Sequence, residues 1–337
     1  MKEFKFNLQL FAGNPNTQTT TSEGLSKGMH TYYEDRLIDN AEPYLVHDQF
    51  GDKYPVPKHE GKTIEFRKYS PLSKALTALT EGVTPDGNSL NMSTITATVS
   101  QYGDYVTCSD VLELTHVDPQ IEQATKLLGS QAGRTLDTVT RDVITAGTNV
   151  MYAPKISGDT ETEVTTRAGL DKTAVLTYNL IFKAVAKLKA MNARPIDDAF
   201  VAIVHPNVAC DLMLSDKWIS VHQYATPENI YNGEIGKLGG VRFVETSEAK
   251  IFGPASTGGA SVYATMIIGA NAYGVTDVNG GGLQHIVKQL GSAGSSDPLN
   301  QRATTGWKAL KTAERLVEEN MIRIEHCCAT EPNAAAN

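Results

Sequence analysis

The stretch DPQIEQATKLLGSQAGRTLDTVTRDVITA, residues 118–146, carries the strongest structural pattern in the chain. Its apolar side chains recur every three or four residues, which is the spacing of one face of an α-helix. They are Ile121, Ala124, Leu128, Ala132, Leu136, Val139 and Val143. Asp118 is a candidate N-cap, Pro119 suits the first helical position, and Gly147 suits the residue after a helix. About 28 residues at 1.5 Å each span roughly 42 Å, so the pattern predicts a long helical strut.

Two strand patterns precede this helix. Thr63–Tyr69 alternates apolar Ile64 and Phe66 with polar residues, and Ser93–Ser100 alternates Ile95, Ala97 and Val99 with threonines. About two dozen residues separate the two patterns, and they include Pro71, Gly82, Pro85 and an Asp86-Gly87 turn signal. Loops of this length are uncommon inside compact domains, so we expect an excursion that leaves the core. A protruding hairpin cannot bury its apolar side within its own domain, and we expect a neighbouring copy to bury it.

The region before the hairpin has the composition of an arm. Residues 13–28 are polar, rich in threonine and without periodicity, and arms of this kind are normally held by something outside their own domain. A short helix is expected over residues 29–40, before Pro43. The start, MKEFKFNLQLFAGN, has a short apolar patch that Asn7 and Gln9 interrupt, which is too short for a signal-peptide core. The sequence therefore predicts a protein that is not exported.

The rest of the chain mixes helices and strands without regular alternation. A polar hairpin or loop is expected over 157–172, a helix over 178–192, a buried strand over 200–204 and a short helix over 206–214. Further strand patterns cover residues 241–245, 262–268, 283–290 and 321–326. Because helices and strands do not alternate, the pattern favours an α+β fold over a doubly wound parallel sheet.

Composition excludes several classes of protein. The 337 residues are 41% hydrophobic and 20% charged, which is typical of a globular protein, and the net charge is −8. An acidic chain without a basic run is not expected to bind phosphate backbones as its main activity. No stretch approaches the length of apolar sequence that a membrane span needs. The four cysteines form no C-x-x-C pair, so reduced thiols and a cytosol-like compartment are expected.

Motifs for catalysis or cofactor binding are weak. The pattern GLSKG at residues 24–28 matches the nucleophile elbow, but a polar arm precedes it where a buried strand is required. The glycines of NGEIGKLGG, residues 232–240, lack the preceding strand of a dinucleotide site and are interpreted as turn glycines. His326, Cys327 and Cys328 are consecutive, so in a strand they point to alternating faces and cannot together hold one zinc ion. His205 precedes Pro206 and is expected to cap or pack. We predict no catalytic, cofactor-binding or metal-ligating residues.

Four stretches together resemble a tailed-bacteriophage major capsid protein, and more narrowly the capsid family typified by podovirus N-four. They are FNLQLFA at residues 6–12, AFVAIVHPNVACDLMLSDKW at 199–218, NGEIGKLGGVRFVET at 232–246 and DPLNQRATTGWK at 297–308. The resemblance implies an α+β Hong Kong 97-type capsid fold. It assigns residues 1–50 to an N-terminal arm and first helix, 51–112 to an extended two-stranded loop and 113–177 to a peripheral domain with a long spine helix. Residues 178–296 would form the axial domain, and 297–337 would return to the peripheral domain and end in a tail.

The resemblance also implies what the protein does. Copies of the chain would assemble in the bacterial host cytoplasm into pentamers and hexamers, which close into an icosahedral virion capsid around double-stranded DNA. Further partners would be a separate scaffolding protein, a portal and, where present, decoration proteins, with no membrane. No motif selects a Lys and Asn pair for isopeptide cross-links, so none is expected. The residues expected at contacts between subunits are Leu8, Leu10, Phe11, Ile64, Phe66, Ile95, Ala97 and Val99.

Three alternatives stay open on the sequence. The first is the shell subunit of a cellular nanocompartment of the encapsulin kind, which would share the fold. The second is a soluble hydrolase that uses Ser26 with a histidine distant in the sequence. The third, a secreted adhesin or surface-array protein, is disfavoured by the missing signal peptide.

Overall fold

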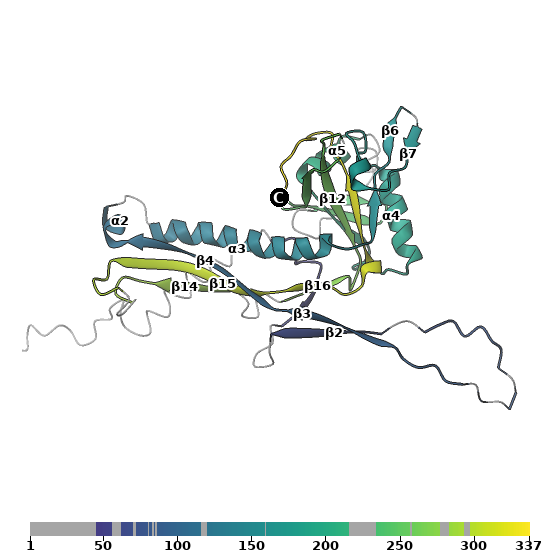
Figure 1. Cartoon of the computed structure of the whole chain (residues 1–337), viewed down its shortest axis with the longest axis horizontal. Coiled ribbons are helices and arrows are strands. Elements are labelled where there is room, and N and C mark those ends of the chain that lie inside the picture. The colour runs from purple at the N-terminus through teal and green to yellow at the C-terminus, as the bar shows by residue number, and fades with distance from the viewer. Residues whose placement is uncertain are drawn as a thin grey trace, which may run out of the picture.

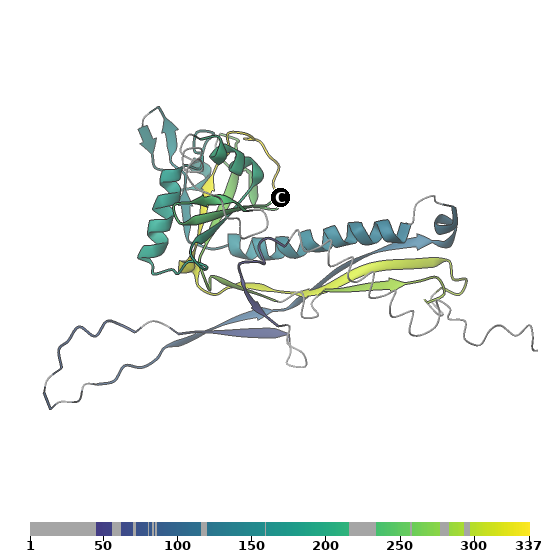
Figure 2. The ribbon, with the colours of Figure 1, turned by 180° about the vertical axis from the view of Figure 1, so that it is seen from behind.

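The computed structural model describes residues 45–55, 62–69, 72–79, 81–82, 84, 86–115, 120–158, 160–215, 234–256, 258–276, 283–292 and 297–337. The polar arm, the helix expected over 29–40, the GLSKG motif and the proposed contacts Leu8, Leu10 and Phe11 lie outside these residues, as do Asp118 and Pro119. Figures 1 and 2 show an elongated molecule: a long helix on a narrow sheet, a compact body at one end of that helix, and a hairpin that reaches away beneath the body.

The predicted strut is present as α3, Gln120–Thr145, whose 26 residues span about 39 Å. It follows the short helix α2, Asp110–Thr115. One face of α3 lies along an antiparallel sheet in the order β14, β15, β4 (Figure 1), which we call the peripheral sheet. Its strands are β14, Leu283–Lys288; β15, Arg302–Lys311; and β4, Ser100–Ser109. Leu128, Ala132 and Leu136 of α3 pack against Trp307 and Ala309 of β15, so helix and sheet share one small apolar core.

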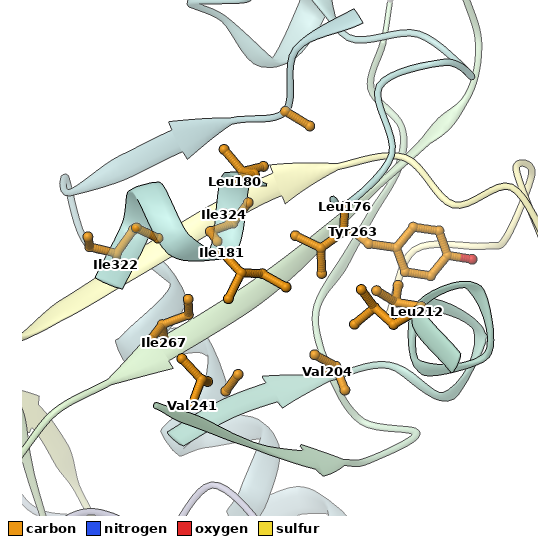
Figure 3. Packing of buried hydrophobic residues seen from close by; sticks show 14 of the residues in the cluster. Leu176, Leu180, Ile181, Val204, Leu212, Val241, Tyr263, Ile267, Ile322 and Ile324 are labelled. Atoms are coloured by element: carbon orange, nitrogen blue, oxygen red, sulfur yellow. The ribbon is translucent and has the colours of Figure 1, made fainter. Parts of the chain in front are cut away.

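The compact body is built on a mixed seven-stranded sheet, ordered β5, β17, β12, β8, β10, β9, with β11 paired to β12. Its strands are β5, Val150–Tyr152; β8, Phe200–Val204; β9, Glu234–Leu238; β10, Val241–Glu245; β11, Ile251–Pro254; β12, Ser261–Ile268; and β17, Met321–His326. Helices α4, Tyr178–Ala190, and α5, Pro206–Met213, cover one face. Figure 3 shows Ile181 of α4 and Leu212 of α5 in this core, beside Val204, Ile267 and Ile324 of the sheet.

Burial on both faces explains the unbroken apolar sequence of β8. Phe200, Ala202 and Val204 pack in the core under α4 and α5. Val201 and Ile203 pack on the opposite face, in a second core that includes Ile144 of α3. A strand that is buried on both faces has a continuous apolar sequence, as predicted for residues 200–204. The predicted helices over 178–192 and 206–214 and the predicted strands over 241–245, 262–268, 283–290 and 321–326 are also confirmed, with ends that differ by two residues or fewer.

The predicted hairpin consists of β2, Thr63–Tyr69, and β3, Met92–Thr98, which pair antiparallel with Phe66 opposite Ile95. After Val99 the same strand direction continues as β4, which leaves β2 and pairs with β15. A small sheet of β1, Asp52–Tyr54, β13, Tyr273–Thr276, and β16, Ala313–Arg315, lies where the hairpin meets the body. The base of the hairpin therefore lies against this small sheet.

Short elements complete the fold. The polar hairpin or loop expected over 157–172 is a hairpin of β6, Lys155–Ser157, and β7, Thr160–Thr162, followed by the 3₁₀ helix η3, Arg167–Gly169. A second 3₁₀ helix, η5, Glu318–Asn320, precedes β17. The C-terminal residues run back over the body, where the Ile251 amide donates to Asn337 Oδ1 at 2.9 Å.

The structure divides the second half of the chain differently from the expected boundaries. The expected axial domain, 178–296, contains β14, yet β14 pairs with β15 in the peripheral sheet. The expected return to the peripheral domain, 297–337, contains β17, yet β17 lies in the body between β12 and β5. A strand pattern indicates which face of the strand is buried but not which sheet the strand joins.

Candidate assembly interface

The base of the hairpin packs against its own chain. The rings of Phe66 and Tyr54 meet edge to face, with centroids 4.8 Å apart. A Cβ placed on Gly274 of β13 would lie 3.0 Å from the Tyr54 ring and 3.3 Å from the Phe66 ring, so a glycine lets β13 approach this pair. As a result Phe66 is 9% exposed.

This packing covers part of the expected contact set within the chain itself. Phe66, Ala97 and Val99, which the sequence assigned to a neighbouring copy, are buried in the isolated chain at 9%, 2% and 9% exposure. The physical reason is the small sheet of β1, β13 and β16, which is built from three distant segments and covers the hairpin base. Ile64 and Ile95 are half-buried, so part of each side chain stays accessible.

Beyond the base, the hairpin leaves its apolar residues uncovered. We call residues 69–92 the hairpin arm; every residue of it that the structure describes is exposed. Leu76 and Leu79 are 86% and 77% exposed, values close to those of a side chain with no neighbours. The other large apolar residues of the arm that stand exposed are Tyr69, Leu72, Leu90 and Met92. Apolar groups gathered on one protruding segment mark an interaction site. Leucines between Pro71 and Gly82 were the signal in the sequence that could have identified it.

Two buried polar contacts hold the segment that leads into the hairpin against α3. His47 donates from its backbone N to Asp137 Oδ1 at 2.8 Å and from its ring Nδ1 to Oδ2 at 2.6 Å. Asp48 accepts from Thr140 Oγ1 at 2.6 Å and also from Lys311 Nζ of β15. All five side chains are buried, where breaking one partner leaves an uncompensated polar group. These contacts join the start of the hairpin to the strut.

The outer face of the peripheral sheet, turned away from α3, has a hollow of about 640 Å³. Gly103 and Gly306 leave this space free of side chains, and a Cβ on Gly306 would lie 2.6 Å from Tyr105 Cβ. Tyr105 and Ile286 line the hollow and are 69% and 39% exposed. Lys288, Asp297 and Arg302 also line it, so the hollow combines apolar and charged groups and has room for side chains from another molecule.

The His-Cys-Cys cluster has no features of a reactive site. His326 is fully buried, with its ring Nε2 2.9 Å from Thr265 Oγ1 and its Nδ1 3.0 Å from the Cys327 carbonyl oxygen. Burial lowers the pKa of His326 to about 4 and raises the pKa of the Cys327 and Cys328 thiols to about 11 and about 12. The imidazole and both thiols are therefore neutral near pH 7. His205 caps α5, as expected, by accepting from the Asn207 amide at 3.2 Å.

Within the part of the chain that the structure describes, no group of three or more His, Cys, Asp or Glu side chains could hold a metal ion. No helix among these residues is long and apolar enough to cross a membrane. The hairpin arm and the outer face of the peripheral sheet are surface features suited to contacts between proteins.

A spine helix on a narrow sheet, a compact body and a long two-stranded loop define a Hong Kong 97-type capsid subunit. The chain belongs to the phage capsid protein family, whose sequence model matches residues 92–313. It is a structural subunit of a phage capsid, and its place is in the virion shell.

Solved capsid structures share the fold at low sequence identity. The capsid of cyanophage Pam1 is 17% identical with a TM-score of 0.63, covering 98% of this chain and 100% of that chain. The capsid of Ralstonia phage GP4 is 13% identical with a TM-score of 0.62, covering 84% and 88%. The capsid of cyanophage P-SCSP1u is 14% identical with a TM-score of 0.59, covering 83% and 87%. None of the curated proteins matches the chain.

Proposed function

We propose that copies of this chain form pentamers and hexamers, which close into an icosahedral shell around double-stranded DNA. In this arrangement the hairpin arm of each copy lies on a neighbouring copy. The exposure of Leu76 and Leu79 carries the proposal, because side chains of this size are rarely presented on a protruding segment without a partner. Ile64 and Ile95, half-buried at the base, extend the same contact.

The energetics favour many contacts over one. Full burial of a leucine contributes about 1.5–3 kcal/mol, so Leu72, Leu76, Leu79 and Leu90 together supply about 6–12 kcal/mol. Association costs about 4–15 kcal/mol in lost translational and rotational freedom. The free energy gained from a single arm contact is therefore close to this cost. In a shell each copy both gives and receives an arm, and a copy leaves only when all its contacts break together. Such a shell is held without covalent cross-links.

The role requires neither catalysis nor a cofactor. A net charge of −8 suits a container that encloses DNA without adhering to it. We infer that assembly takes place in the cytoplasm of the bacterial host, with a separate scaffolding protein, a portal and, where present, decoration proteins as partners.

The experiment is assembly of purified chain, followed by velocity sedimentation and electron microscopy. The triple variant Leu72→Ser, Leu76→Ser, Leu79→Ser is compared with a control that carries Lys74→Ser and Thr77→Ser in the same arm. Rings and closed particles from the wild type and the control, with free subunits from the triple variant, are the expected result. A wild-type chain that stays monomeric at high concentration, with its partners present, contradicts the proposal.

A further inference from the structure

The peripheral sheet ends on one side in a long strand with an open edge. β4 pairs with β15 over its full length, from Ser100 opposite Lys311 to Ser109 opposite Arg302. Among the described residues it is the last strand of the sheet, and no strand pairs with its other edge. An open edge of ten residues presents a row of backbone donors and acceptors that another strand can pair with.

A groove runs beside this edge, between β4 and the first half of α3, with a volume of about 460 Å³. Ala124, Leu128 and Cys108 form its buried floor. Val106 and Leu127 stand at its rim, 39% and 74% exposed. A strand added to the edge of β4 would direct every second side chain into this groove.

Two of the polar side chains that line the groove are paired with each other. Gln131 donates from Nε2 to Asp104 Oδ2 at 2.7 Å and accepts from Trp307 Nε1 at 3.3 Å. Gln120, Gln123 and Arg134 also line the groove, so its lining is mixed. Apolar side chains suit the part of the space over Ala124 and Leu128, where the floor is apolar.

One segment of this protein has the matching pattern. Residues 4–11, FKFNLQLF, lie outside the described residues. Over residues 4–10 the sequence alternates Phe4, Phe6, Leu8 and Leu10 with Lys5, Asn7 and Gln9, and Phe11 ends the alternation. Alternation with a period of two is typical of a strand with one apolar face. Eight residues in a strand span about 26 Å, which fits along the roughly 33 Å of β4.

We propose that residues 4–11 of a second copy add as a strand to the free edge of β4, with Phe4, Phe6, Leu8 and Leu10 in the groove beside α3. About 33 residues separate this segment from Leu45, which packs on the α3 core. With the helix expected over 29–40 included, the link can extend up to about 90 Å and reach a neighbour. The inference rests on the proposed shell function and names a second link between copies.

The test is disulfide cross-linking in mixed particles. One set of copies carries Leu127→Cys, and the other carries a single arm cysteine at Phe6, Asn7, Leu8, Gln9 or Leu10. All copies carry Cys108→Ala, because the native thiol lines the same groove. After mild oxidation with copper phenanthroline, denaturing electrophoresis without reductant measures the dimer. Particles in which the arm variant is mixed with copies that lack Leu127→Cys give the background yield of dimer. The matched control site is Leu214→Cys on the body, where Leu214 is 71% exposed.

The expected result is a dimer whose yield from Phe6→Cys, Leu8→Cys and Leu10→Cys is at least about fivefold above that from Asn7→Cys and Gln9→Cys, since alternate side chains point to opposite faces. Equal yields at all five positions, or equal yields with Leu214→Cys, overturn the added strand. A cross-link confined to one chain in the double variant Leu8→Cys, Leu127→Cys, and absent between mixed copies, overturns the assignment to a second copy. Particle formation is scored on the same samples, so a failure of shell assembly is distinguished from a failure of this contact.

Discussion

Arg167 donates two hydrogen bonds to the buried carboxylate of Glu325, from Nε to Oε2 at 2.7 Å and from Nη2 to Oε1 at 2.6 Å. Arg323 adds a third, from Nε to Oε1 at 2.8 Å. The Arg167 guanidinium also lies 3.5 Å from the centroid of the Phe252 ring. The cluster joins η3 to β17 and pairs the buried carboxylate of Glu325 with two arginines, of which Arg167 is 34% exposed.

Glu325→Ala is expected to destabilise the subunit by about 3 kcal/mol, because it leaves two arginines without their buried partner. Urea unfolding of dissociated subunits measures the change. Glu161→Ala is the control: Glu161 pairs with Lys183 at 3.8 Å on the surface, and its loss is expected to cost less than about 0.5 kcal/mol. Similar losses from both variants would contradict the role of the buried network.

Acidification is expected to weaken the subunit through His326, whose pKa burial lowers to about 4. In the unfolded chain the imidazole titrates near pH 6.5, so between pH 6.5 and 4 the unfolded state binds a proton that the folded state does not. The free energy of unfolding therefore decreases as the pH is lowered through this window, by about 2 kcal/mol between pH 7 and pH 5. His326→Gln removes this part of the pH dependence in urea titrations at the two pH values. An unchanged difference between pH 7 and pH 5 in the variant would show that His326 is not the responsible group.

Phe66→Ala and Tyr69→Ala are expected to act on different processes. Phe66 is 9% exposed and packs on Tyr54, so its truncation costs about 3 kcal/mol of subunit stability. Tyr69 is 60% exposed, so Tyr69→Ala leaves thermal unfolding of the dissociated subunit unchanged and lowers the yield of particles. Calorimetry and sedimentation separate the two outcomes. Equal thermal stability of both variants would argue against burial of the hairpin base by its own chain.

Gly306→Ala is expected to destabilise the peripheral sheet by about 1–3 kcal/mol, because the added Cβ would lie 2.6 Å from Tyr105 Cβ and 2.8 Å from the Asp104 carbonyl oxygen. Gly87→Ala is the matched control, since nothing lies within 4 Å of a Cβ there. Thermal unfolding of dissociated subunits compares them. A wild-type melting temperature for Gly306→Ala would contradict the close approach of β4 and β15.

Two strands of the peripheral sheet, β4 and β15, were hard to predict from the sequence for a physical reason. β4, SQYGDYVTCS, and β15, RATTGWKALK, each carry a glycine near the middle and have no clean alternation of apolar and polar residues. The glycines are required where the two backbones approach closely, and that requirement exists only once the strands are paired. The hairpin strands β2 and β3 alternate clearly, and their prediction is confirmed by the register of Phe66 with Ile95.

The residues of the hairpin also divide into features that the sequence identified and features that it did not. The sequence identified the excursion and its apolar residues, but it assigned Phe66, Ala97 and Val99 to a partner and passed over Leu76 and Leu79. Whether an apolar side chain is free depends on what covers it, and the residue that lets β13 cover Phe66 is Gly274, more than 200 positions away. Periodicity within one segment contains no information about that contact.

By itself the sequence determined the features that depend on neighbours within a few residues: α3 from its helical repeat, β2 from its alternation, and β8 from its unbroken apolar run. The tertiary structure decided that β14 joins the peripheral sheet, that β17 joins the body, and which half of the hairpin remains uncovered. The difference is physical, because local backbone geometry sets a residue's direction, whereas sheet membership and burial are set by contacts between segments that only the folded chain brings together.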